Sequence, residues 1–300
     1  MEPWRHDREG ADVDLTFVTS HQRERSADDR SLTSVLEARG VRIVPRSFDD
    51  PDAVWDGVGV AVVRTAPQDP DERERFVAWA ERLDAGTQLS CPPDVLRWNT
   101  HRSYLLELED RGAPIVPSAW LGRGDRIPLE ELLRVRGWDD VVLRPAVGSR
   151  GVVRVDGGRV GLDATSGQHH LDVLLAHDDA VVQPWPPGIE RRGRWSVVLV
   201  DGQVSHAVRT LPAEGTDRPA TVAEVVHGTD LEPDLGRLAA WVAETTAITR
   251  LPVASVDLVE DAAGTPQVEA FDAVAPELYL AAMPAVASTV ADAILALADP

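Results

Sequence analysis

The stretch VVLRPAVGSRG, residues 141–151, joins an apolar run to a cation and then to a loop that holds two glycines. The apolar run predicts a buried strand that ends at Arg144. Exposed amides in such a loop, beside an arginine, could wrap a polyphosphate. The plain alternative is an ordinary turn after a strand.

Two further patterns follow along the chain. Residues 180–185, AVVQPW, predict a strand that runs into proline and exposes backbone groups to an adenine edge beside Trp185. Its alternative is a strand that merely ends at a proline. Residues 196–209 predict a hairpin that turns at Asp201-Gly202.

A third pattern is acidic, with Asp257 on one late strand and Glu269 and Asp272 on the next. Carboxylates aimed at one point from two antiparallel strands suit Mg²⁺ that bridges phosphates. Glu269 and Asp272 are three residues apart, so they face opposite sides unless a bulge intervenes. Solvated acidic residues at strand edges are the alternative.

The first part of the chain alternates strand and helix. We expect a polar leader over residues 1–14, strands at 15–20, 41–44 and 58–63, and intervening helices, the first capped by Asp28 and Asp29. This order favours a small parallel α/β sheet over residues 15–95. Beyond it we expect a helix capped by Thr100 and stopped at Gly112, a strand at residues 115–116, and a final helix that carries Val286, Val290 and Ile294.

Composition limits the function. The 300 residues hold 50 acidic and 30 basic side chains, a formal charge of −20, and every basic residue is arginine. Such a balance repels nucleic acid and anionic membranes, so neither is an expected partner. A single cysteine, Cys91, and a polar start without an apolar segment predict a cytoplasmic protein.

The order of these signals resembles the ATP-grasp superfamily. The stretches WNTHRSYL (residues 98–105), VVLRPAVGSRG, VVQPW, GRWSVVLVDGQVSHAV and APELYL are similar to the group that contains the cycloserine-pathway ligase. The likeness covers about residues 95–298, and residues 15–95, with Arg64 at a strand end, resemble the domain that precedes ATP-grasp in that group. It implies a two-lobed α+β fold over residues 96–300, with an ATP-binding small lobe at about 113–185 and a C-terminal lobe at about 186–300.

The resemblance also implies roles for single residues. ATP and Mg²⁺ are the implied cofactors, and a homodimer is the family's tendency. Phosphate would be held by Arg102 and Arg144, where the family has lysines, and by the loop residues Gly148, Ser149 and Gly151. The remaining roles fall on Gln183, Pro184 and Trp185 at the adenine, Arg218 and His206 at the transferred group, and Asp257, Glu269 and Asp272 at the metal.

The implied activity is a carboxylate-amine or intramolecular ligase in specialised metabolism, which forms a C–N bond through an acyl phosphate on a small amino-acid-like substrate. Three departures favour a second hypothesis, a nucleotide-binding pseudoenzyme with a regulatory or scaffolding role. The family's Gly-Glu-x-Ser is Gly-Arg-Trp-Ser at residues 193–196, and its glutamates at positions 270 and 275 are alanines.

Histidines carry less weight in the sequence. A packed strand position is an equal alternative for His206, and we expect His169, His170 and His177 in a solvated loop.

Overall fold

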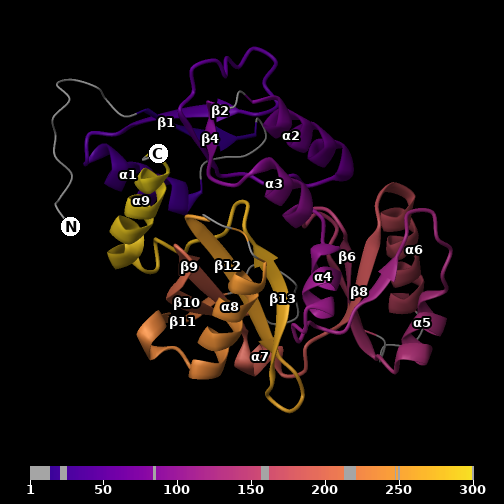
Figure 1. The fold of residues 1–300 in the computed structure, drawn as a ribbon. Helices are drawn as coiled ribbons and strands as arrows, with labels where there is room; N and C mark the ends of the chain where they lie inside the picture. The colour runs from indigo at the N-terminus through magenta and orange to yellow at the C-terminus, as the bar shows by residue number, and fades with distance from the viewer. Residues whose placement is uncertain are drawn as a thin grey trace.

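The computed structural model describes residues 14–20, 26–83, 86–156, 162–212, 221–246, 248 and 251–298. Its strands form three sheets, each with helices packed nearby (Figure 1). Within these residues, no helix has both the length and the apolar character needed to cross a membrane.

The first sheet is parallel, as the alternating pattern predicts. Its strand order is β2-β1-β3-β4. Its elements are β1 (Asp14–Thr19), α1 (Ala27–Glu37), β2 (Arg42–Ser47), β3 (Val60–Val63), α2 (Pro70–Arg82) and β4 (Gln88–Leu89). The cap of α1 differs from the expectation: Ser26 is the N-cap residue and forms a reciprocal capping box with Asp29. Asp28 takes no part in this cap and instead accepts hydrogen bonds from backbone amides at residues 278–280.

Two short helices, α3 (Pro93–Asn99) and α4 (Tyr104–Asp110), follow the first sheet. The expected Thr100 cap is wrong, because Thr100 ends α3 and its hydroxyl donates to the Leu96 carbonyl at 2.6 Å. Asn99 and Tyr104 instead tie these helices to β13 (Pro266–Asp272). The Asn99 amide donates to the Phe271 carbonyl at 2.8 Å, and the Tyr104 hydroxyl accepts from the Phe271 amide at 3.0 Å.

The second sheet has the order β5-β8-β6-β7 and is antiparallel. Its elements are β5 (Ala119–Leu121), α5 (Leu129–Arg136), β6 (Asp140–Pro145), β7 (Val153–Asp156), α6 (Leu162–His177) and β8 (Ala180–Pro184). The expected strand at residues 115–116 is only an isolated bridge from Ile115 to Val268. His169, His170 and His177 lie on α6 rather than in a loop.

The third sheet has the order β11-β10-β9-β12-β13. The predicted hairpin joins β9 and β10, and its turn has positive φ at Asp201 and Gly202. The elements are α7 (Ile189–Arg192), β9 (Arg194–Val200), β10 (Gln203–Leu211), β11 (Thr221–His227), α8 (Pro233–Thr245), β12 (Val253–Glu260) and β13. Short 3₁₀ turns occupy Gly228–Asp230, Pro284–Val286 and Ala296–Ala298.

The last helix, α9 (Ala287–Leu295), returns to the start of the chain and lies beside α1 (Figure 1). Its buried face, with Val290 and Ile294, shares one apolar cluster with Leu32 of α1 and Leu15 of β1. Val198 and Val253 of the third sheet belong to the same cluster. The first and third sheets therefore share a core.

Truncating Ile294 to alanine should weaken this shared core. Ile294 is 1% exposed, so we expect Ile294→Ala to lower the free energy of unfolding by about 2–5 kcal/mol. Val135→Ala is the control, since Val135 is 67% exposed and its loss should change stability by less than about 0.5 kcal/mol. Urea denaturation measures both, and equal effects would contradict the packing described.

Candidate functional site

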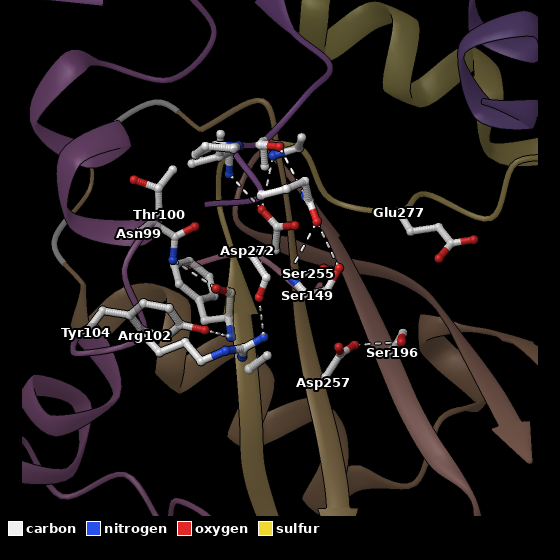
Figure 2. A pocket seen from close by; sticks show the side chains of 18 of the residues that line it. Asn99, Thr100, Arg102, Tyr104, Ser149, Ser196, Ser255, Asp257, Asp272 and Glu277 are labelled. Carbon is white, nitrogen blue, oxygen red and sulfur yellow. Dashed lines mark hydrogen bonds between the residues drawn. The ribbon is translucent and has the colours of Figure 1, made fainter. Parts of the chain in front are cut away.

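A cavity of about 370 Å³ lies where three parts of the chain meet: the loop at residues 145–151 (the glycine loop), α3–α4 and the third sheet (Figure 2). Five of the predicted site residues line it: Arg102, Gly148, Ser149, Asp257 and Asp272. Seven others lie outside its lining: Arg144, Gly151, Gln183, Pro184, Trp185, His206 and Glu269. Arg218 lies outside the described residues.

The Arg102 side chain is hydrogen-bonded to the backbone of the glycine loop. Its Nε and Nη2 donate to the carbonyls of Pro145 and Gly148, each at 3.2 Å. Its backbone amide donates to the Ala146 carbonyl at 2.8 Å. The predicted phosphate cation and the predicted phosphate loop are thus in direct contact.

The glycine loop is hydrogen-bonded to Gln68 in the N-terminal part of the chain. Gln68 is not among the site residues predicted from the sequence. The Ser149 amide and hydroxyl both donate to Gln68 Oε1, at 3.3 and 3.0 Å. Gly148 has φ +74°, and a Cβ there would lie 2.6 Å from the Gln68 Cα. The position therefore requires glycine for both conformation and space.

Glu269 binds two arginines. Arg144 Nη2 donates to its Oε1 at 2.5 Å, Arg194 Nη2 donates to the same oxygen at 2.9 Å, and Arg194 Nε donates to Oε2. A β-bulge makes this possible: Asp257 pairs with Ala270 and Leu258 with Val268, which leaves Glu269 as the extra residue. The bulge is the condition under which Glu269 and Asp272 can share a face.

The charges of this cluster set its protonation. Burial favours the neutral form of Glu269, but Arg194 and Arg144 outweigh burial and lower its pKa to about 2. Burial lowers the pKa of Arg144 to about 10, against the opposing effect of Glu269. Both partners are consequently ionised at neutral pH.

Asp257 lies on the cavity wall beside two hydroxyls. Ser196 Oγ donates to its Oδ1 at 2.6 Å and lies 3.1 Å from the Tyr279 hydroxyl (Figure 2). Burial raises the pKa of Asp257, and the nearby Arg194 and the Ser196 hydroxyl offset only part of this. A bound cation would favour its ionised form.

The loop that carries Glu277 and Tyr279 to the cavity is held by Asp28 of α1. The Asp28 carboxylate accepts the backbone amides of Leu278, Tyr279 and Leu280 at 2.6, 3.1 and 2.7 Å. These bonds fix Tyr279 at φ 52°, a conformation that non-glycine residues rarely adopt. Glu277 also lines the cavity, and burial, then Asp28 and Asp257, raise its pKa.

His206 supports this loop from the other side. It is fully buried on β10, and its Nε2 lies 2.8 Å from the Leu278 carbonyl, so Nε2 carries the proton. Its Nδ1 then accepts from the Ser205 hydroxyl at 3.1 Å. Burial lowers the pKa of His206. In this geometry His206 is the packed strand histidine, not a residue that faces the substrate.

The predicted adenine segment lies at the end of β8. The Gln183 side chain donates to Ser118 Oγ at 3.0 Å, and the Trp185 indole donates to Glu190 at 3.0 Å while Arg154 stacks over its ring at 4.2 Å. The Gly151 carbonyl accepts a hydrogen bond from His170 Nε2 at 2.6 Å. These side chains are occupied within the lobe, which leaves backbone groups as the means of contacting a base.

The donor set fits one Mg²⁺ better than two. Asp257 and Asp272 supply carboxylate oxygens on the cavity wall, although Asp272 Oδ1 also accepts the amides of Val274 and Ala275 at 2.9 and 3.0 Å. Glu269 does not fit, since both its oxygens bind guanidinium groups. Across the described ranges, no three His, Cys, Asp or Glu side chains gather as a metal site.

Sequence reasoning missed Gln68, Asp28, Ser196, Tyr279 and Glu277 as site residues. Gln68 and Asp28 act from the N-terminal unit, more than 75 residues away in sequence from what they hold, so no local pattern marks them. Ser196 and Glu277 stood inside the stretches similar to the ATP-grasp group, which was the available signal.

Comparisons with known proteins identify the fold and the group of proteins that this chain resembles. Residues 15–90 match the family model of the N-terminal domain of D-cycloserine synthetase DcsG. The crystal structure of D-cycloserine synthetase DcsG superposes with a TM-score of 0.78 at 24% identity, over 95% of this chain and 99% of that one. The ATP-grasp ligase PsnB, bound to a phosphomimetic precursor variant, Mg and ADP, superposes with a TM-score of 0.66 at 17% identity, over 96% and 99%.

The chain has the ATP-grasp fold. Within ATP-grasp proteins it is similar to the cycloserine-biosynthesis group. The cycloserine biosynthesis protein DcsG of Streptomyces lavendulae is 28% identical over 272 residues, which cover 84% of this ATP-grasp chain and 88% of that protein. The fold class and the likeness expected from the sequence are confirmed, whereas the domain boundaries and the residue roles stay predictions.

The Glu269 cluster of this ATP-grasp chain should make its stability depend on pH. The pKa of Glu269 is depressed from 4.5 to about 2, so its contribution is present above pH 4.5 and is lost as the pH falls toward 2. Glu269→Gln should cost about 3–5 kcal/mol of unfolding free energy at pH 7, because two arginines lose their counter-charge, and markedly less near pH 2.5. Urea denaturation at both pH values measures the difference.

Glu81→Gln is the matched control, since the Glu81–Arg97 pair is about half exposed and should contribute at most about 1 kcal/mol at either pH. A Glu269→Gln effect as small as the control's, or one that stays constant with pH, would contradict the buried pair.

Proposed function

We propose that this chain is an ATP- and Mg²⁺-dependent ligase that activates a carboxylate of a small amino-acid-like substrate as an acyl phosphate and joins it to an amine. The observation that carries the proposal is the arrangement of cations around the cavity. Arg102 and the glycine loop line the cavity. Arg144 lies outside the lining, and its buried Nε has no hydrogen-bond partner among the described residues. A buried, unpaired donor is costly, and a phosphate oxygen would satisfy it.

The comparisons support the general reaction class. DcsG is named for D-cycloserine synthesis, and PsnB is a ligase whose structure holds Mg and ADP. Both cover nearly the whole chain. Their substrates are their own; for this chain the amino-acid-like substrate is part of the proposal.

In the proposed reaction a carboxylate oxygen of the substrate attacks the γ-phosphorus, and the bond from that phosphorus to the bridging oxygen breaks to release ADP. The amine nitrogen then attacks the acyl carbon, phosphate leaves, and loss of a proton completes the amide. Arg102, Arg144 and the loop amides would hold the phosphates in line and offset their charge. Asp257 and Asp272 would hold one Mg²⁺, which supplies further charge neutralisation when bound.

The other end of the cavity suits the amino-acid-like substrate. Glu277 is a carboxylate on this wall, the Tyr279 hydroxyl is hydrogen-bonded to it, and Ser196 Oγ lies 3.1 Å from that hydroxyl. A carboxylate and two hydroxyls are donor and acceptor groups for an ammonium and a polar side chain. The substrate amine would lie here, with its carboxylate toward the arginines.

The pseudoenzyme hypothesis keeps one specific support, the capture of Glu269 by arginines. It predicts nucleotide binding without turnover. The ligase predicts ADP release from Mg·ATP that a particular amino acid stimulates.

The decisive variant is Asp257→Asn, which keeps the shape and the contact to Ser196 but removes the charge that would hold Mg²⁺. We expect substrate-stimulated ADP release to fall by about 10²–10³-fold while the melting temperature stays near that of the wild type. Glu260→Gln is the control, because Glu260 lies on the same strand but binds Arg192 at 3.0 Å outside the cavity lining.

Both measurements begin with wild-type protein, Mg·ATP and a panel of amino acids, with nucleotide binding followed by thermal shift. Binding without stimulated ADP release would refute the ligase in favour of the pseudoenzyme. Absence of nucleotide binding would refute both hypotheses, and full activity of Asp257→Asn would refute the metal role of Asp257.

A further inference from the structure

We infer that the Arg194 guanidinium takes the place of a second metal ion at the transferring phosphate, so that nucleotide binds this chain with a single divalent cation. The inference rests on the proposed function, since it concerns the nucleotide in the same cavity. The observation behind it is that Arg194 binds Glu269.

Arg194 is not one of the residues that line the cavity, but it lies on the same face of the third sheet as residues that do. Side chains two apart on a strand share a face, and Ser196, two residues along β9, lines the cavity and bonds Asp257. Its partner Glu269 neighbours Ala270, which also lines the cavity. Arg194 therefore stands beside the space that the nucleotide phosphates would occupy.

Arg194 is anchored but not enclosed. Glu269 takes two of its five N–H donors, and its side chain is 32% exposed while that of Glu269 is 6% exposed. Nearby Glu269 and Asp257 both raise the pKa of Arg194, so it stays charged at every relevant pH. The anchored guanidinium can present its outer edge to an anion without first losing rotamer freedom.

A second ion finds too few ligands here. Mg²⁺ requires several oxygens in near-octahedral order, and it is commonly held by one or two carboxylates together with phosphate and water. Asp257 and Asp272 meet that need once. Glu269 would have to release Arg194 from its Oε2 before that oxygen could bind an ion, and Ala270 offers only a methyl group to the cavity.

The charges match the substitution. Arg194 stands where the similar ATP-grasp sequences have the glutamate of Gly-Glu-x-Ser, so the charge at this position changes from −1 to +1, a gain equal to the charge of one divalent ion. Guanidinium groups bind phosphate oxygens through paired N–H donors, so this charge can be delivered directly. The cluster supplies what a second ion would supply, without its coordination shell.

The test counts ions. Mn²⁺ is titrated into wild-type protein that holds a non-hydrolysable ATP analogue, free Mn²⁺ is measured by electron paramagnetic resonance, and bound nucleotide is measured in the same sample. We expect one Mn²⁺ for each bound analogue in the wild type. Two Mn²⁺ per analogue would overturn the inference while the proposed function stands, and a chain that binds no nucleotide would overturn the proposed function and the inference with it.

Variants then assign the effect to Arg194. Arg194→Glu releases Glu269 from one guanidinium and adds a carboxylate, so we expect a second Mn²⁺ per bound ATP analogue. Arg194→Gln removes the charge without adding a ligand, so we expect one Mn²⁺ and about ten- to hundredfold weaker binding of the analogue.

Arg192→Glu is the control for a charge reversal nearby, since Arg192 lies on α7 and binds Glu260, whereas Arg194 binds Glu269. It should match the wild type in ion count and affinity. If folded Arg194→Glu still bound one Mn²⁺ with wild-type affinity, or if Arg192→Glu gained a second ion equally, the inference would be wrong.

Discussion

Glu269 forms ion pairs that join the second and third sheets beside the cavity. Arg144 comes from β6 of the second sheet, Arg194 from β9 of the third, and Glu269 from the bulge in β13. Burying three charges costs several kcal/mol for each ion, and the cost is offset only where their hydrogen bonds are well formed. The bulge is what turns the carboxylate toward both arginines.

The N-terminal unit completes the cavity. Gln68 receives the glycine loop, Asp28 holds the loop that carries Glu277 and Tyr279, and the buried Asp29–Arg64 pair at 2.7 Å lies next to Pro276. Helix α9 packs on α1 in return. Ala66, Pro67 and Gln68 line the cavity, so the first part of the chain supplies one of its walls.

Much of this architecture could be predicted from sequence because it follows local periodicity. The βαβ order, the hairpin at Asp201-Gly202 and the strands β6 and β8, which end at Pro145 and Pro184, depend on short-range patterns. The helix α6 was not predicted, since the polar stretch around its two adjacent histidines hides the short apolar stripe of Leu171, Leu174 and Leu175 in its second half. Thr100 shows a second limit, because a threonine before an apolar run can end one helix as readily as it begins the next.

The site was less predictable because its partners are distant in sequence. Arg102, Asp257 and Asp272 could be named from motifs, but the three amides that Asp28 holds lie about 250 residues away. Whether Glu269 would bind metal or arginine depended on a bulge and on Arg194, 75 residues earlier. The most direct measurement is a crystal structure with Mg²⁺ and a non-hydrolysable ATP analogue. The account predicts phosphate oxygens against Arg102, the Arg144 Nε and the outer edge of Arg194, and phosphates bound elsewhere with Arg144 Nε still unpaired would contradict it.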